Sequence, residues 1–379
     1  MKISQVEVMA LGVPLDEPLR WGAMEVHTKG GVIVRISTDE GVTGIGEAGF
    51  SAEYYPTVAP AITHQLAPLL IGENPLAIRH LWEKMHAATH IWGRRGIETY
   101  ALSGVDTALW DIAGKVANLP IHTMLGSDKE QVPAYFAPSL KPASAIVTEA
   151  LTAVRDGYHA IKLRGGRGID VDVDLVAQVA EAVDGCLTLC MDANMSYNRR
   201  DALTLAHRLE EFGVYWLEEP IACHSLEQYA LDHAWLNERV GINLAGGESL
   251  FTRHEYIGLF NPRAFDILQP DAVSVGGISE AKRVADLASA WNIKCIPHIA
   301  CSSGTGIGMA AGLQVILASP NAELMEVDAY GGPAWDGLLK QPLQLRDGDV
   351  VAPTAPGLGV ELADDAEERF GLTTTVQAT

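Results

Sequence analysis

The sequence predicts an α/β protein: a (β/α)7β TIM-like barrel with an N-terminal α+β capping domain that the C-terminal tail completes. Two observations lead to this prediction. From residue 132 onward, short apolar runs alternate strictly with amphipathic stretches, as expected for parallel strands joined by helices. Residues 1–125 differ, because their strands precede their helices. We therefore expect a capping domain over 1–125, a barrel over 126–335, and a C-terminal segment over 336–379 that packs back on the capping domain.

Eight apolar runs are the expected barrel strands. They are nearly continuous in apolar residues, which is typical of parallel strands covered on both faces. Seven helices are needed between them, and stretches 173–183 and 278–290 have the amphipathic pattern of such helices. The chain then turns through Gly331–Pro333 and makes a tail with a turn at Asp347–Gly348. The runs lie at 132–137, 159–164, 187–192, 214–218, 243–248, 265–271, 293–298 and 323–327.

The first 125 residues predict a hairpin followed by helices. Residues 32–36 and 42–45 are strand-like and flank a turn at 39–41. Helical stretches are expected at 54–70, 75–90 and 99–117. The last is the strongest, because its apolar residues recur every three or four positions.

Composition narrows the class of protein. The formal net charge is −21, and we find no Lys/Arg run that could supply a basic face, so we expect no nucleic-acid partner. No apolar run is long enough to span a bilayer, and the N-terminus lacks the apolar core of a signal peptide, so we expect no membrane partner. The five cysteines include no C-x-x-C pair and are read as free thiols in a reducing cytoplasm.

A polar residue closes six of the eight runs, at intervals of 23 to 30 residues. One strand-helix unit takes about 30 residues, so each polar residue falls at the C-terminal end of a successive strand. In a barrel these ends meet at one mouth, where the chemistry is done. The six residues are Asp192, Glu218, Glu248, Asp271, His298 and Glu326.

Three of these residues are carboxylates on consecutive strands: Asp192, Glu218 and Glu248. Clustered acids repel one another unless a cation lies between them. Oxygen ligands without Cys or His favour Mg²⁺, with Mn²⁺ as the second choice. We therefore predict a Mg²⁺ site.

Asp271 and His298 end adjacent strands. A carboxylate beside an imidazole fixes its tautomer and raises its basicity, which suits a general base. Glu326 would act as a protonated acid, for which burial and neighbouring anions would have to raise its pKa.

Lys162 and Arg164 lie two residues apart on the second strand, so their side chains point the same way, either into the barrel or outward. Pointing inward, they would match an anionic substrate. Together, the residues predicted at the strand ends indicate a single type of reaction. A divalent cation binds the carboxylate of a carbon acid, a base removes the α-proton, and cations hold the charge that develops.

At this point the chain resembles the enolase superfamily, in its mandelate racemase/muconate lactonizing enzyme branch. The resemblance runs over the whole length and includes the motif from Ala101 to Ile112 and the tail at 356–359. Asp192-Ala-Asn194, Glu218-Glu-Pro220 and Gly247-Glu248 match the metal-ligand segments of that family. Asp271 and His298 match the dyad of the mandelate racemase subgroup, and Glu326 matches its electrophilic glutamate.

One departure from the family pattern affects the expected reaction. Racemases of this type have Lys-x-Lys on the second strand, and here the second lysine is Arg164. Arginine is protonated at any ordinary pH and is a poor proton acceptor. The resemblance then implies a one-base acid-sugar dehydratase in which His298 takes the α-proton, the β-hydroxyl leaves, and a 2-keto-3-deoxy acid forms.

By similarity, the capping domain supplies specificity loops at about 15–29 and 49–55, whose candidate substrate-binding residues are Arg20, Trp21 and Tyr54. Asn194 is a fourth candidate. The family also implies a homo-oligomer acting on a small carboxylate.

Three alternatives stay open. A sugar-lactone cycloisomerase would share every catalytic residue, a racemase or epimerase would need a second base, and a non-catalytic descendant would only bind metal or metabolite. The sequence does not separate aldonates from aldarates.

Overall fold

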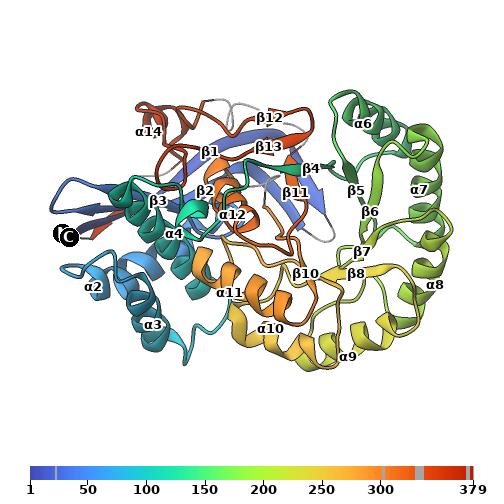
Figure 1. The fold of residues 1–379 in the computed structure, drawn as a ribbon, viewed down its shortest axis with the longest axis horizontal. Helices are drawn as coiled ribbons and strands as arrows, with labels where there is room; N and C mark the ends of the chain where they lie inside the picture. The colour runs from blue at the N-terminus through green and yellow to red at the C-terminus, as the bar shows by residue number, and fades with distance from the viewer. Residues whose placement is uncertain (22–23, 301–303, 329–336, 373–375, 379) are drawn as a thin grey trace.

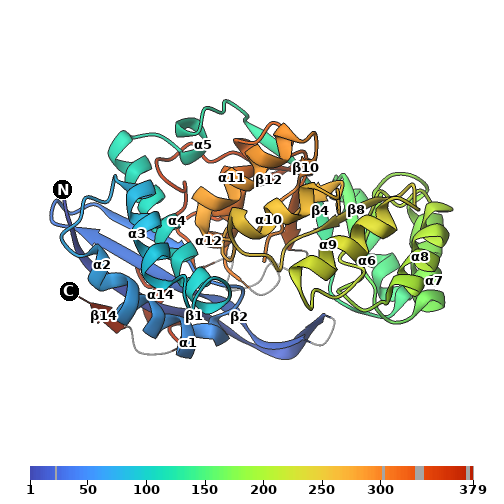
Figure 2. The same ribbon diagram turned by 90° about the horizontal axis from the view of Figure 1, so that it is seen from below.

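The computed structural model describes residues 1–21, 24–300, 304–328, 337–372 and 376–378. It consists of a barrel and an adjoining α+β domain (Figure 1). Both ends of the chain lie on the α+β domain, on the side away from the barrel (Figures 1 and 2). Among the described residues, no helix is both long enough and apolar enough to cross a membrane.

The capping domain is an antiparallel sheet covered by helices. Strands β1 (Ile3–Trp21), β2 (Met24–Thr38) and β3 (Thr43–Glu47) follow one another in the sheet, and β14 (Val376–Ala378) pairs with β1. The predicted hairpin is confirmed as β2 and β3. The long first strand had no counterpart in our prediction. The expected loop at 15–29 is wrong in part, because β1 and β2 pair as far as Trp21 and Met24.

The helices of this domain confirm the predicted stretches. The longest, α4 (Ile97–Ala117), lies directly on β3. The close approach requires glycine, because a Cβ at Gly44 or Gly46 would meet α4 backbone oxygens at 2.2 and 2.1 Å. Stretch 54–70 is interrupted near Pro60, which has no N–H to donate. The other elements are η1 (Ala52–Tyr54), α1 (Tyr55–Pro60), η2 (Ala61–Leu66), α2 (Ala67–Leu70) and α3 (Ile78–Thr89).

All eight predicted barrel strands are present, and parallel pairing runs from β4 through β10, with β11 pairing β4 on its other side. All except β4 are shorter than predicted, and β9 and β10 have two residues each. The strands are β4 (Gln131–Ala137), β5 (Ala160–Arg164), β6 (Thr188–Asp192), β7 (Trp216–Glu218), β8 (Asn243–Gly246), β9 (Ile267–Leu268), β10 (Lys294–Cys295) and β11 (Met325–Asp328).

Seven helices connect these strands and cover the barrel from outside, as Figure 1 shows for α6 to α9. The (β/α)7β prediction is therefore confirmed. A short helix, α5 (Ile121–Met124), precedes the barrel. The seven are α6 (Ala143–Arg155), α7 (Ile169–Val183), α8 (Arg199–Glu210), α9 (Leu226–Asn237), α10 (Thr252–Phe260), α11 (Gly277–Ala290) and α12 (Gly306–Leu317).

The C-terminal segment contacts both parts of the molecule. Strands β12 (Leu345–Arg346) and β13 (Asp349–Val351) form a hairpin about the predicted Asp347–Gly348 turn, and β13 pairs antiparallel with β4. Helix α14 (Ala366–Phe370) packs on β1, and β14 completes the capping sheet. The domain boundary at 125 remains a prediction. The boundary at 335 and the turn at 331–333 lie outside the described residues.

Helix α4 of the capping domain binds the N-terminus of barrel helix α11 through hydrogen bonds. The buried carboxylate of Asp106 accepts hydrogen bonds from the Ser279 backbone N–H (2.9 Å) and hydroxyl (2.7 Å). The Trp82 indole donates to the Gly276 carbonyl at 2.8 Å. An acid at a helix N-terminus also interacts favourably with the helix dipole. The two domains are therefore joined next to Asp271, which precedes α11.

We expect Asp106 to make the free energy of unfolding depend on pH. Burial raises the pKa of Asp106 from 3.8 to about 7, which the Ser279 hydrogen bonds only partly oppose. The folded state therefore retains a proton that the unfolded state releases, and stability is lost as pH rises from about 4 to about 7. At about 1.4 kcal/mol per pKa unit, this loss is on the order of 4 kcal/mol.

The test is to compare the wild type with Asp106→Asn, which cannot ionise, by chemical denaturation between pH 4 and pH 7. The variant should lose less stability than the wild type over this interval. Parallel stability curves for the two proteins would contradict the prediction.

Candidate active site

The six polar residues predicted at strand ends lie close to those ends, with one correction. Asp192 and Glu218 are the last residues of β6 and β7, and Glu248 follows β8 by two residues. Asp271 and His298 each follow their strands by three residues. Glu326 was expected to end its strand but is the second residue of β11. The hydrophobic core inside the barrel, which includes Trp216 and Tyr135, lies among the same strands.

Lys162 points into the barrel and is fully buried. Its Nζ lies 3.0 Å from Glu218 Oε1 and 3.1 Å from Glu326 Oε1. Burial alone would lower the pKa of Lys162, but Glu218, Glu326 and Asp192 outweigh it and raise the pKa. Lys162 is therefore a fixed positive charge that joins β5, β7 and β11. The sequence left open whether this side chain points into the barrel or outward, and the structure shows that it points inward.

Arg164, two residues after Lys162, also points into the barrel interior. Its Nη1 lies 2.8 Å from Asp192 Oδ2, and its Nη2 lies 3.9 Å from Glu326 Oε1. Asn194 supports the same carboxylate through its backbone N–H (2.8 Å) and its side-chain amide (2.9 Å). Burial opposes protonation of Arg164, but Asp192 and Glu326 raise its pKa further, so it remains a cation.

His298 lies between two carboxylates. Its Nδ1 is 2.7 Å from Asp271 Oδ2, and its Nε2 is 3.2 Å from Glu248 Oε2. Asp271 also accepts from the backbone N–H of Ala300 (3.0 Å) and of Val273 (2.9 Å), so it is held by its own loop and by the next one. Burial would lower the pKa of His298, but Glu248, Asp271 and Glu326 raise it to about 10. The predicted pairing of Asp271 with His298 is present.

The expected raised pKa of Glu326 is wrong for this arrangement of charges. Burial does raise it, but Lys162, His298 and Arg164 outweigh burial and lower the pKa of Glu326 to about 2. The anions that were expected to crowd Glu326 are paired with cations instead. Glu326 is therefore ionised and accepts a hydrogen bond from the Tyr135 hydroxyl at 3.1 Å.

The three candidate metal ligands come from adjacent strands, and each contacts a basic side chain of the protein. Burial and the charge of Glu218 raise the pKa of Asp192 to about 7, although Arg164 and Lys162 oppose this. Negative charge at this end of the barrel is thus incompletely balanced, which fits a site for a cation. Asn194 Oδ1 is buried without a hydrogen-bond partner beside Asp192 and is a further oxygen donor. Within the described ranges, no three His, Cys, Asp or Glu side chains are grouped to hold a metal as they stand.

Comparisons with known proteins identify the family. Residues 3–126 match the family model described as mandelate racemase / muconate lactonizing enzyme, N-terminal domain, and residues 145–366 match the one described as enolase C-terminal domain-like. The chain belongs to the mandelate racemase branch of the enolase superfamily. The resemblance inferred from the strand-end motifs is confirmed.

Characterised members of the superfamily are similar to this chain over most of its length. D-galactarolactone cycloisomerase from Agrobacterium fabrum is 34% identical over 98% of this chain and 99% of that protein. Arabinonate dehydratase from Saccharolobus solfataricus is 34% identical over 89% of this chain and 90% of that protein. L-talarate dehydratase from Polaromonas sp. JS666, solved with Mg and L-glucarate, has a TM-score of 0.85 and 28% identity over 100% and 99% of the two chains. These similarities support an enzymatic role.

Three residues that the sequence analysis did not single out contact the carboxylates of this site. The Trp216 indole and the Gln269 amide donate to Glu218 Oε2 at 3.1 and 2.9 Å, and Tyr135 contacts Glu326. Trp216 and Gln269 lie two residues before Glu218 and Asp271. The two-residue period of strands could have indicated them. Tyr135 faces Glu326 only because β4 pairs with β11, which no local pattern shows.

An aromatic wall stands beside His298. We use this name for Phe50, Tyr54, Tyr100 and Phe251. The Phe50 ring is 5.9 Å from the His298 ring and 5.5 Å from the Tyr100 ring, which stacks on Tyr54 at 5.8 Å. The rings of Phe50 and Tyr100 therefore lie between the candidate Tyr54 and His298. Arg20 and Trp21 lie at the end of β1, and their side chains are outside the described part of the structure.

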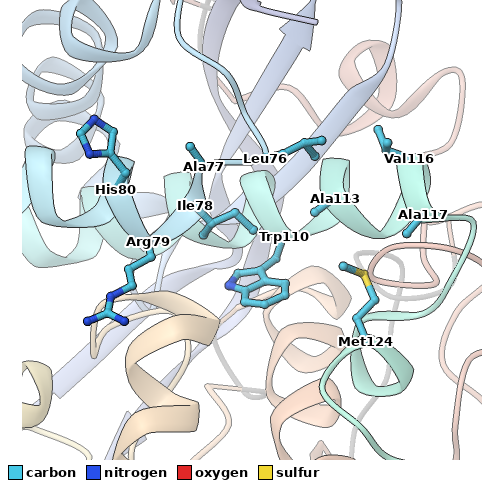
Figure 3. Close-up of a pocket in the computed structure, with 10 residues that line it drawn as sticks. All are labelled: Leu76, Ala77, Ile78, Arg79, His80, Trp110, Ala113, Val116, Ala117 and Met124. Atoms are coloured by element: carbon cyan, nitrogen blue, oxygen red, sulfur yellow. The ribbon is translucent and has the colours of Figure 1, made fainter.

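A separate hollow of about 530 Å³ lies on the capping domain. Residues of α3, α4, α5 and the turn before α3 line it, among them Leu76, Trp110 and Met124 (Figure 3). The strand-end residues do not line it, so it is distinct from the candidate site.

We expect Lys162→Met to destabilise the fold strongly, by about 3–5 kcal/mol, because it leaves the buried carboxylates of Glu218 and Glu326 without their cation. Chemical denaturation in EDTA measures this change in the free energy of unfolding. Lys282→Met is the matched control. Its partner Asp286 is on the surface, so the loss should stay below about 1 kcal/mol. Equal losses in the two variants would contradict the prediction.

Proposed function

We propose that the protein is a Mg²⁺-dependent acid-sugar dehydratase that removes the proton α to a carboxylate and eliminates the β-hydroxyl, giving a 2-keto-3-deoxy acid. The observation that carries the proposal is the arrangement of one base and no second base. His298 is paired with Asp271, and Arg164 takes the position where a racemase of this branch has its other proton acceptor.

Arg164 argues against inversion at the α-carbon. Racemisation by two bases needs a group that accepts a proton on one face while another donates on the opposite face. The carboxylates of Asp192 and Glu326 favour the protonated form of Arg164, which therefore cannot accept. Lys162 is held as a cation in the same way. A single-base elimination is what the remaining groups can perform.

In this proposal each residue has a defined task. Lys162 and Arg164 attract and orient the substrate carboxylate and hold the charge that develops when the α-proton leaves. Asp271 fixes Nδ1 of His298, so Nε2 is the nitrogen that accepts the α-proton. For this, His298 must first separate from Glu248 and lose the proton that makes it a cation between Glu248 and Asp271. His298 then returns the proton to the departing β-hydroxyl, which leaves as water, and the enol product tautomerises to the 2-keto acid.

Asp192, Glu218 and Glu248 would hold Mg²⁺, with Mn²⁺ as a substitute. When bound, the cation supplies Lewis-acid polarisation of the substrate carboxylate. The proposal is supported by the all-oxygen donor set, by the unbalanced charge around Asp192 and by the Mg in the solved L-talarate dehydratase. Glu248 is the ligand that would change partner, since it now contacts His298.

A lactone cycloisomerase is the second candidate. D-galactarolactone cycloisomerase and arabinonate dehydratase are each 34% identical to this chain, over 98% and 89% of its length. Opening a lactone by β-elimination needs the same base and the same cations. The substrate is a small carboxylate or lactone in either case. A homo-oligomer and a cytoplasmic location remain predictions.

The first test is a panel of aldonates, aldarates and their lactones, followed by ¹H NMR in D₂O with Mg²⁺ and the enzyme. We expect a new, partly deuterated C3 methylene from an open-chain acid, and no such signal with His298→Asn. Formation of the methylene from a lactone substrate would favour the cycloisomerase. Loss of the α-proton signal without elimination, or racemisation that persists in His298→Asn, would contradict the one-base reading.

The second test concerns the metal site and needs no substrate. Mg²⁺ should raise the melting temperature of the wild type, since a ligand at 100 times its Kd stabilises a protein by about 2.7 kcal/mol. Glu248→Gln should lose most of this rise. Asp174→Asn, which removes an exposed carboxylate on α7, should keep it. An unchanged response in Glu248→Gln would exclude Glu248 as a ligand.

A further inference from the structure

Residues 47–50 of the capping domain contact both chain segments that carry the Asp271–His298 pair. The Gly49 N–H donates to the Val273 carbonyl at 2.8 Å, two residues beyond Asp271. The Phe50 ring meets the His298 ring edge-on at 5.9 Å. Glu47 accepts hydrogen bonds from Thr305 and Gly308, which follow His298 in the chain. This stretch is thus a link between the capping domain and both members of the pair.

Glu47 binds the N-terminus of barrel helix α12. Its buried carboxylate accepts from the Thr305 N–H (3.0 Å), the Thr305 hydroxyl (2.6 Å) and the Gly308 N–H (2.8 Å). Thr305 is the N-cap residue and in turn accepts from the Ile307 N–H at 3.1 Å. The first N–H groups of a helix have no partner within it, and its N-terminus attracts negative charge. Glu47, from the capping domain, provides both the hydrogen-bond acceptor and the negative charge at this helix N-terminus.

The surroundings of Glu47 leave room for a carboxylate and for little else. A Cβ at Gly31 would lie 2.2 Å from Glu47 Oε1, and a Cβ at Gly304 would lie 3.0 Å from the same atom. A Cβ at Gly308 would lie 2.9 Å from Oε2. Glycines from the capping domain and from the barrel therefore face this one side chain. The partners of this carboxylate are the backbone N–H groups of Thr305 and Gly308 and the Thr305 hydroxyl.

A short path of hydrogen bonds leads from Thr305 back to His298. The Gly304 N–H donates to the Ala300 carbonyl at 2.8 Å. The Ala300 N–H donates to Asp271 Oδ2 at 3.0 Å, the oxygen that also contacts His298 Nδ1. These hydrogen bonds connect the N-terminus of α12 to the Asp271–His298 contact.

We propose that Glu47 is a positioning residue for His298: it fixes the N-terminus of α12 to the capping domain and thereby sets the geometry of His298 against Asp271. Glu47 lies outside the Asp271–His298 pair and acts through Thr305, Gly304 and Ala300. The effect on turnover rests on the proposed function, whereas the effect on the His298–Asp271 hydrogen bond does not.

Glu47→Gln is the conservative variant. Burial raises the pKa of Glu47 to about 7, with the Thr305 and Gly308 hydrogen bonds opposing, so the neutral acid is accessible near neutral pH. Glutamine resembles that neutral form in size and keeps one acceptor oxygen. Glu47→Ala removes the acceptor altogether. Asp111→Asn is the matched control, because Asp111 is an equally buried acid of the capping domain that binds Ile45, Lys115 and Leu358 instead.

The experiment compares the four proteins by thermal unfolding, by NMR of the imidazole Nδ1 proton of His298, and by kcat and KM. The His298 signal is assigned by its absence in His298→Asn. We expect Glu47→Ala to shift or lose this signal and to lower kcat by up to about 100-fold with a smaller change in KM. Glu47→Gln should restore most of both. Asp111→Asn should lower the melting temperature with the His298 signal and kcat retained.

A folded Glu47→Ala protein with the wild-type His298 signal would overturn the proposal, as would an equal disturbance of that signal in Asp111→Asn. If Glu47→Ala does not fold, Gly31→Ala replaces it, because the three atoms nearest to its Cβ all belong to Glu47, so it displaces the carboxylate without removing it. An unchanged His298 signal in Gly31→Ala would then overturn the proposal. If the wild type turns over no acid sugar, the proposed function fails, and the His298 signal still decides the role of Glu47.

Discussion

Charge balance inside the barrel is the constraint on which the rest of the site depends. Five carboxylates meet at the strand ends, and they share Lys162, Arg164 and His298. Buried charges are costly unless they are paired. Each cation therefore contacts two carboxylates from different strands: Lys162, for example, joins Glu218 to Glu326. The remaining excess of negative charge is the feature that makes a cation site chemically reasonable here. Burial and the charge of Glu218 raise the pKa of Asp192, whereas the pKa of Glu326 is lowered.

The capping domain completes the site by holding barrel helices at their N-termini. Asp106 binds the start of α11 and Glu47 binds the start of α12, the helices that follow Asp271 and His298. In both places a buried carboxylate meets N–H groups that a helix cannot satisfy by itself. Docking of the two domains and alignment of the dyad are in this way coupled through the same hydrogen bonds.

We expect substrate specificity to be decided at the boundary between these domains. The aromatic wall combines residues of the capping domain with Phe251, which precedes α10, and its Phe50 ring touches His298. A dehydratase and a cycloisomerase could share all the charged residues beneath this wall. We therefore expect the difference between them to depend on the residues around His298. The paired β1 and β2 strands extend toward the barrel (Figure 2).

The sequence by itself determined the order of the barrel strands and which residue types stand at their ends, because strand length, helix length and the apolar pattern are local properties. It also led to the proposed single-base reaction, since an arginine at position 164 cannot accept a proton. Only the tertiary structure decided which carboxylate contacts which cation, and hence the low pKa of Glu326. It alone revealed Asp106 and Glu47, whose partners lie 173 and 258 residues away in the chain. Contacts at that distance depend on how the two domains dock, and no local pattern of residues records them.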